Sequence, residues 1–252
     1  MSAVLELANA TVRLGGRLAL DDVSLSVSAG EVVGVLGANG AGKTTLVRAA
    51  LGLQRLASGA ARLGGRAASM LSERERAALA GYLPQERRVA WNLPAWRVAA
   101  LGAATRPPAQ AHGVALQALS EMGMGELVER GVLEMSGGER GRVLIARLMA
   151  TQAPLLIADE PAAGLDPDAQ LLVLERLRER AARGAAVVAT LHDLTLAARA
   201  CDRLAVLSHG RLVAFGPPRE ALSRTVLASA FALAGELVET PAGLVVAARR
   251  MA

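Results

Sequence analysis

The segment from Gly37 to Thr44 has residue types and a spacing that could bind phosphate. It reads GANGAGKT and matches the pattern G-x-x-x-x-G-K-[ST] at every position. The apolar stretch 31–36 before it predicts a strand, and residues 43–51 after it predict a helix. Glycines in such a loop let backbone N–H groups point inward, and the helix dipole adds positive charge, so the main chain would hold a polyphosphate. Lys43 would reach the β- and γ-phosphates, and the Thr44 hydroxyl would be a ligand for Mg²⁺.

Lys43 is the only lysine among the 28 basic residues, and all the others are arginine. A compact ammonium fits between two phosphates as a point charge, whereas a planar guanidinium does not. The plainer interpretation of the segment is a glycine-rich turn that only joins a strand to a helix. The motifs that follow favour the phosphate-binding interpretation over this one.

Two adjacent carboxylates, Asp159 and Glu160, end the apolar stretch 155–158, which predicts a buried strand. Open α/β sheets bind their ligands at the carboxyl ends of parallel strands. Gln85 closes another short predicted strand, and His192 comes just after a third. The carboxylate pair is therefore a candidate for ligand contact, against the plain alternative of a solvated strand end.

A second glycine turn, MSGGE at 135–139, stands directly before a predicted helix at 140–150. Its backbone amides would point at a ligand from the start of that helix, which makes an anion site by the same physics as the first loop.

The remaining pattern predicts the elements that position these residues. Apolar and polar residues alternate from Val4 to Val27, which predicts a small antiparallel sheet. After Pro154 strand patterns alternate with helix patterns, which predicts a mostly parallel sheet. The tail predicts two short helices and then a hairpin with strands at 236–238 and 244–247.

Composition limits the class of protein. With 252 residues, 52% of them hydrophobic and only 2% aromatic, the chain can bury a full core of aliphatic side chains. Scarce aromatics and dispersed arginines disfavour nucleic-acid binding despite the net charge of +5. Cys201 is the single cysteine, so no intrachain disulfide forms and a reducing compartment is expected. No signal peptide and no uninterrupted apolar span are visible, which predicts a soluble protein with any membrane role borrowed from a partner.

Six elements in one order resemble the ATP-binding cassette (ABC) ATPases: GANGAGKT, Gln85, MSGGE, LLIADE, AGLD at 163–166, and His192. The resemblance runs from Val4 to about Leu222. The MSGGE element carries the most weight, because many nucleotide hydrolases have the phosphate loop but few have this turn.

The resemblance implies an α/β fold with a P-loop NTPase core and a mostly parallel sheet. An N-terminal antiparallel β subdomain and an inserted helical subdomain at about 86–153 are expected to complete it. Residues 1–225 would form a single ABC ATPase domain, and residues 226–252 a C-terminal extension.

The resemblance also implies ATP and Mg²⁺ as cofactors and assigns roles residue by residue. The expected nucleotide contacts are Gly37, Asn39, Gly40, Ala41, Gly42, Lys43, Thr44, Thr45, Ser136, Gly137, Gly138, Glu139 and Asp166. The expected Mg²⁺ ligands are Thr44, Gln85 and Asp159, and the expected catalytic residues are Glu160 as general base, His192 at the γ-phosphate and Gln85 as its sensor.

In this family the MSGGE turn is expected to bind the γ-phosphate held by the other subunit, so a head-to-tail homodimer is implied. The other implied partners are integral membrane permease subunits and, indirectly, a substrate-binding protein, with no nucleic acid. The protein would lie in the cytoplasm, on the inner face of the cell membrane through the permease. Residues 86–106 are expected to couple to the permease, with Arg87, Arg88 and Trp91 or Trp96 as contacts.

Two positions depart from the family pattern. Met135 replaces a leucine, which is a volume-conserving apolar change. Leu14 replaces an aromatic residue that stacks on adenine, so weaker ATP binding is expected.

Several looser segments, at 82–85, 89–94 and 190–194, look like the cassettes of iron-siderophore, haem and cobalamin importers, although Ala103 stands where those cassettes often have arginine. The rival hypothesis is a soluble cassette ATPase acting on nucleic acid, ribosomes or cofactor assembly. Such relatives tend to carry two cassettes or long inserted arms, and this chain has neither. A binding module without catalysis is opposed by Glu160 and His192.

Overall fold

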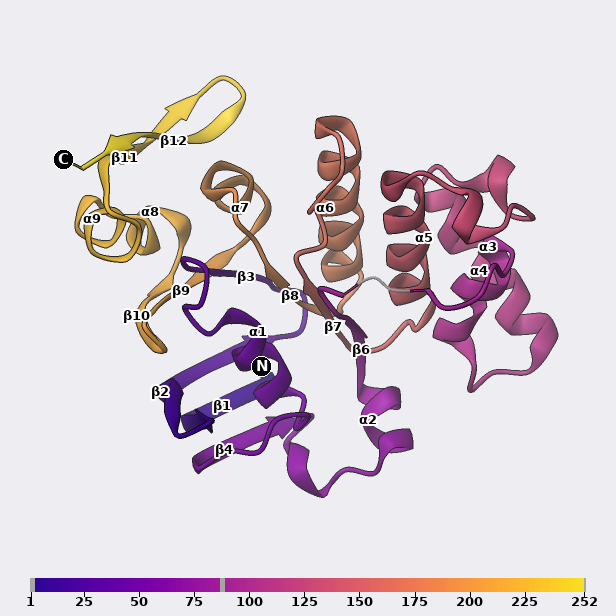
Figure 1. Ribbon diagram of the computed structural model, residues 1–252, viewed down its shortest axis with the longest axis horizontal. Coiled ribbons are helices and arrows are strands. Elements are labelled where there is room, and N and C mark those ends of the chain that lie inside the picture. Colours follow the sequence, from indigo (N-terminus) through magenta and orange to yellow (C-terminus); the bar gives the residue numbers. More distant parts are fainter. Residues whose placement is uncertain (1–2, 87–88, 252) are drawn as a thin grey trace.

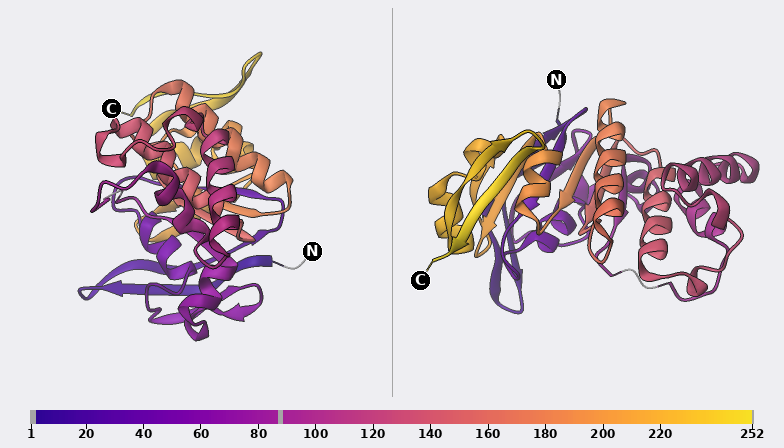
Figure 2. Two further views of the ribbon diagram at one scale, coloured as in Figure 1. Left: turned by 90° about the vertical axis from the view of Figure 1, so that its right-hand side faces the viewer. Right: turned by 90° about the horizontal axis from the view of Figure 1, so that it is seen from above.

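The computed structural model describes residues 3–86 and 89–251, so Arg87 and Arg88, two of the predicted permease contacts, lie outside the described residues. Figure 1 shows a central sheet with an antiparallel sheet below it, helices α3, α4 and α5 to its right, and a C-terminal hairpin at the upper left. Seen from above, the helical part and the hairpin occupy opposite ends of the molecule (Figure 2).

The central sheet has six strands in the order β10-β9-β3-β8-β7-β6. Their bounds are β3 Val32–Leu36, β6 Ala80–Leu83, β7 Leu155–Asp159, β8 Ala186–Thr190, β9 Arg203–Ser208 and β10 Arg211–Gly216. All neighbours pair in parallel except β9 and β10, which are antiparallel. Strands β3, β7 and β8 are buried along their whole length, which is why the sequence reads there as continuous apolar runs. The predicted mostly parallel sheet is confirmed.

The register of this sheet brings three strand ends together. Asp159 pairs with Thr190 across β7 and β8, and Thr190 pairs with Val35 across β8 and β3. Since Gly37 follows Val35 by two residues, the carboxylates and the glycine loop must meet at one edge of the sheet.

The antiparallel sheet has the order β2-β1-β4-β5, with bounds β1 Ala3–Leu14, β2 Arg17–Ser28, β4 Ser58–Leu63 and β5 Arg66–Ala67. It confirms the sheet predicted from the alternation in twos. Alternate residues of β3 face opposite sides: Val33 and Val35 pack in a core shared with this sheet, whereas Val32 and Leu36 pack in a core shared with the helices.

Helices fill the inserted segment and flank the central sheet. The α-helices are α1 Lys43–Ala50, α2 Glu73–Leu79, α3 Ala95–Ala100, α4 Pro108–Glu121, α5 Gly137–Ala150, α6 Pro167–Ala182, α7 Leu194–Ala200, α8 Pro218–Ala221 and α9 Arg224–Phe231. Short 3₁₀ turns cover Ala68–Met70, Leu101–Ala103, Gly125–Leu127 and Val132–Glu134. No helix within residues 3–86 and 89–251 combines the length and the apolar character that crossing a bilayer requires.

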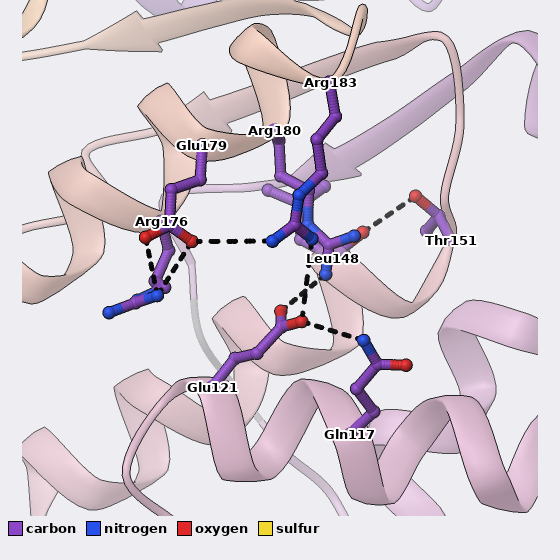
Figure 3. Close-up of polar contacts among 8 residues, drawn as sticks. All are labelled: Gln117, Glu121, Leu148, Thr151, Arg176, Glu179, Arg180 and Arg183. Atoms are coloured by element: carbon purple, nitrogen blue, oxygen red, sulfur yellow. Dashed lines mark hydrogen bonds and ion pairs between the residues drawn. The ribbon is translucent and has the colours of Figure 1, made fainter.

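An ion-pair network joins the inserted helices to the core (Figure 3). Glu121, at the end of α4, accepts from Arg180 of α6 at 2.6 Å, and Arg183 lies 3.9 Å from the same carboxylate. Arg180 and Glu121 are mostly buried, so their attraction is less screened than that of a surface pair. The network therefore helps to fix where α4 and the neighbouring α5 lie relative to the sheet.

The C-terminal hairpin consists of β11 Leu233–Thr240 and β12 Gly243–Arg250, which is longer than the strands predicted at 236–238 and 244–247. It is held against α7 because Arg199 donates to the Leu244 carbonyl at 2.8 Å and Val246 N–H donates to Thr195 Oγ1 at 3.1 Å. Helix α9 crosses the predicted boundary at 225, and the division there stays a prediction.

Candidate functional site

The loop from Gly37 to Gly42 leaves β3 and enters α1. Gly37 and Gly42 have φ values of 151° and 107°, and a Cβ on them would lie 2.5 Å from the Leu207 carbonyl oxygen and 2.7 Å from the Ala19 carbonyl oxygen, respectively. Only glycine fits both positions. Gly42 is also the N-cap of α1 and has no side chain to bond the first helical amides, which leaves them open to an anion.

Lys43 is the first residue of α1, and its side chain is folded back across this loop. Its Nζ donates to the Gly37 carbonyl at 2.8 Å and to the Ala38 carbonyl at 3.3 Å, and the residue is only 7% exposed. Burial lowers the pKa of Lys43, while the charges of Glu160 and Asp159 act to raise it. An ammonium has three protons, so the third can bind a phosphate oxygen.

Asp159 is the last residue of β7, directly before Glu160, and is fully buried. Its Oδ1 accepts from Thr190 Oγ1 at 2.5 Å, whereas its Oδ2 has no hydrogen-bond partner among the described residues. A buried carboxylate oxygen without a partner is costly unless a cation or water binds it. Thr44 and Gln85, which line one cleft, carry side-chain oxygens as well. Oxygen ligands of this kind suit a hard cation such as Mg²⁺, which takes few protein ligands.

Glu160 is held in an uncommon conformation. Its φ is +53°, in the left-handed region, and its backbone N–H donates to Thr190 Oγ1 at 2.8 Å. Its Oε1 lies 2.5 Å from His192 Nε2, so the imidazole fixes the direction of the carboxylate. Non-glycine residues in this region cost on the order of 1–3 kcal/mol and cluster at functional sites.

A cleft of 710 Å³ collects most of these groups, and its walls are Leu14, Ala19, Asn39, Gly40, Gly42, Lys43, Thr44, Thr45, Gln85, Glu160 and His192. Gly37, Ala41 and Asp159 are buried and are not in the lining. The predicted contacts Ser136, Gly137, Gly138, Glu139 and Asp166 are not in the lining.

The MSGGE turn instead starts α5. Ser136 caps this helix and Glu139 bonds back to the Ser136 amide at 2.8 Å, an arrangement that lowers the pKa of Glu139. A Cβ on Gly137 would meet nothing within 4 Å, so the surface there is open. Asp166 caps α6 by accepting from the Ala169 amide at 2.9 Å.

With the glycine loop and the MSGGE turn both in place, residues 20–163 match the ABC transporter family. The chain belongs to this family.

Curated members of the family are similar over most of the cassette. A hemin import ATP-binding protein of Streptomyces coelicolor is 41% identical over 87% of this chain and 80% of its own length. A cobalamin import ATP-binding protein of Halobacterium salinarum is 38% identical over 90% of this chain, which spans 58% of that longer protein.

Solved structures agree on the fold of the ABC cassette. An ATP-binding subunit of an ABC transporter superposes with a TM-score of 0.78 at 30% identity, covering 85% of this chain and 90% of that one. A putative metal-chelate type ABC transporter in an inward-facing conformation gives 0.84 at 24% identity, covering 100% and 98%. The predicted ABC ATPase fold is confirmed, and the cassette is an ATPase of this family.

Sequence reasoning missed two residues of the cassette's site. Ala19 lines the cleft, and an alanine in a strand gives no sequence signal for a ligand contact. Thr190 contacts both carboxylate residues, and the only available signal was a hydroxyl at the end of an otherwise apolar strand.

Proposed function

We propose that this chain is the ATP-hydrolysing subunit of a membrane importer, for a substrate of the haem, cobalamin or iron-siderophore type. The observation that carries the proposal is the cleft lined by Lys43 and the Glu160–His192 pair. Asp159, which directly precedes Glu160, is buried with one carboxylate oxygen that has no partner among the described residues. The names of the hemin and cobalamin import relatives support the transported class.

In the proposed mechanism the loop amides and the third proton of Lys43 bind the β- and γ-phosphates of ATP. Thr44, Gln85 and Asp159 would hold Mg²⁺, which neutralises charge on the phosphate oxygens. Glu160 takes the proton of the attacking water, and His192 holds that carboxylate in place and contacts the γ-phosphate.

Two copies are proposed to act together. The open start of α5 at Gly137 lies outside the chain's own cleft, so its amides are available to the γ-phosphate bound by a second copy. The same surfaces meet twice in a head-to-tail pair, which closes two identical sites with one two-fold axis. ATP would close this pair, and hydrolysis would open it.

A groove of 570 Å³ supports a permease partner. It lies between α2 and β6 on one side and α5 with the 3₁₀ turn at 101–103 on the other, and Gln85 follows β6 by two residues. Arg147 lines this groove, and its side chain makes no hydrogen bond or ion pair to the described residues. Burial lowers its pKa, so an acidic or carbonyl group of a partner would stabilise the guanidinium.

The two tryptophans differ in their suitability as permease contacts. Trp91 is 73% exposed but is not part of the groove lining. Trp96 packs edge-on against His112 and donates to Glu129 at 3.1 Å, so it belongs to the helical part. Trp91 remains the proposed aromatic contact, and docking would place the cassette on the inner face of the membrane.

Replacing Arg147 with Glu tests the permease contact. Charge reversal in a partly buried contact should weaken binding to the permease by more than about tenfold and abolish substrate uptake in proteoliposomes. ATP hydrolysis by the isolated cassette should stay near the native rate.

The matched control is Arg62→Glu, the same charge change at an exposed position of β4, with thermal unfolding as a check on folding. Native permease binding and native uptake by the assembled transporter with Arg147→Glu would refute the groove as the docking site.

Leu14 gives a second test, directed at the adenine. Its side chain is 44% exposed and lines the cleft beside Lys43 and Thr44, where an aromatic ring could stack on the base. Leu14→Tyr should tighten ATP binding about three- to tenfold, because offset stacking contributes on the order of 1 kcal/mol. The rate of the chemical step should change little, since stacking is equal in the ground and transition states.

Calorimetry with ATP and GTP measures this effect. Leu18→Tyr, at a neighbouring position that is 45% exposed and outside the cleft lining, is the control. Equal ATP affinity for Leu14→Tyr and the native chain would mean that Leu14 does not contact the base.

A further inference from the structure

The Thr190 hydroxyl connects the two carboxylate residues of the site. Thr190 ends β8, is fully buried and pairs with Asp159 of β7. Its Oγ1 donates to Asp159 Oδ1 at 2.5 Å and accepts the Glu160 N–H at 2.8 Å. A hydroxyl has one proton and two lone pairs. Thr190 therefore gives its proton to Asp159 and accepts the Glu160 N–H with a lone pair.

The first bond acts on Asp159. A carboxylate turns easily about its last torsion, because that torsion has only broad preferences. The bond from Thr190 selects which oxygen is occupied, so Oδ1 is tied to protein and Oδ2 keeps no partner among residues 3–86 and 89–251. The oxygen that stays available is therefore fixed before any cation arrives.

The second bond acts on Glu160. Its φ of +53° is a conformation that a glutamate rarely adopts, and in this part-buried place its backbone N–H donates to Thr190 Oγ1 at 2.8 Å. This backbone conformation sets where the Glu160 side chain leaves the strand, and from there it reaches His192.

We infer that Thr190 is a positioning residue for ATP hydrolysis, which orients the metal-binding oxygen of Asp159 and holds the backbone of Glu160 with one hydroxyl. The assignment rests on the proposed roles of Asp159 and Glu160. The new point is that both residues also need a buried hydroxyl at the end of the adjacent strand β8.

Thr190→Val and Thr190→Ser separate the hydroxyl from the bulk of the side chain. Valine has nearly the same volume and no hydroxyl, whereas serine keeps the hydroxyl. Groups that orient a metal ligand typically contribute 10- to 100-fold, so Thr190→Val should lower kcat by about that factor. Thr190→Ser should recover most of the loss.

A binding measurement distinguishes positioning from general damage to the fold. ATP affinity is measured with Mg²⁺ and with EDTA, and thermal unfolding is followed without nucleotide. Thr190→Val should lose about 10- to 100-fold of the Mg²⁺-dependent gain in affinity and keep its affinity in EDTA. Thr195→Val, which removes a hydroxyl that accepts from Val246 N–H outside the cleft lining, should behave as the native chain.

Three results would overturn the assignment. These are a native kcat and Mg²⁺ response in Thr190→Val, an equal loss in Thr190→Ser, or an equal fall in affinity with and without Mg²⁺. Asp159→Asn and Glu160→Gln are measured beside them. If those two variants turn over ATP at the native rate, the proposed roles are wrong and the assignment of Thr190 is wrong with them. If they lose turnover while Thr190→Val does not, only the assignment of Thr190 is wrong.

Discussion

Glu160→Gln should lower ATP turnover by about 10²- to 10⁴-fold, the usual contribution of a general base. The amide has the shape of the carboxylate and can still accept from His192, but it cannot take a proton from water. ATP binding should therefore persist. Because hydrolysis is what opens the proposed dimer, an ATP-bound dimer should accumulate.

Phosphate release measures the loss of turnover, calorimetry measures ATP binding, and light scattering after gel filtration measures the dimer. Glu236→Gln makes the same chemical change at an ion pair with Arg224 in the C-terminal hairpin, and it should turn over ATP at the native rate. Native turnover by Glu160→Gln would exclude Glu160 as the base, and a monomer at saturating ATP would count against the closed pair.

Lys43→Ala should weaken ATP binding by about 2–5 kcal/mol, since truncating a buried, hydrogen-bonded charge leaves its partner charge uncompensated. The effect has two sources. The phosphates lose their cation, and the loop loses the two bonds from Nζ to the carbonyls of Gly37 and Ala38. Turnover should fall at least as far as binding.

Lys43→Arg separates charge from shape. It keeps the positive charge, but a planar guanidinium needs more room than a slot in which the lysine is only 7% exposed. It should therefore bind ATP more weakly than the native chain. Thermal unfolding of both variants checks the fold, and native hydrolysis by Lys43→Ala would refute the phosphate-loop assignment.

The parts of the site that the sequence predicted are those built from neighbouring residues. GANGAGKT contains its own turn, cation and helix start, so its geometry follows from local backbone rules. The capped start of α5 at Ser136 follows in the same way from MSGGE. The run 155–158 predicted β7 because a strand buried on both faces needs an uninterrupted apolar sequence.

The parts that the sequence could not predict depend on register between distant segments. Thr190 contacts Asp159 only because β7 and β8 pair residue for residue over a separation of 31 positions. The bond from His192 to Glu160 needs the same register together with the left-handed turn at Glu160. No local pattern states either condition.

The sequence also did not predict the length of the C-terminal hairpin or the packing of the two tryptophans. The hairpin is longer than the clearly alternating residues because β11 packs on α9 and β12 packs on α7. The sequence also does not show which of the two tryptophans is packed. Trp96 is packed because it contacts His112 and Glu129, and these contacts depend on the tertiary structure.

In the proposed dimer the phosphate loop of one copy is completed by the start of α5 in a second copy, and a disulfide between these two segments would trap that contact. Asn39→Cys and Gly137→Cys are combined in the Glu160→Gln chain and oxidised with and without Mg²⁺ and ATP. Native Cys201 will not interfere, because burial raises the pKa of its thiol to about 12. We expect covalent dimers on a non-reducing gel when ATP is present, and none from either single cysteine variant. A double variant that stays monomeric with ATP bound, or that forms its disulfide within one chain, would exclude this head-to-tail arrangement.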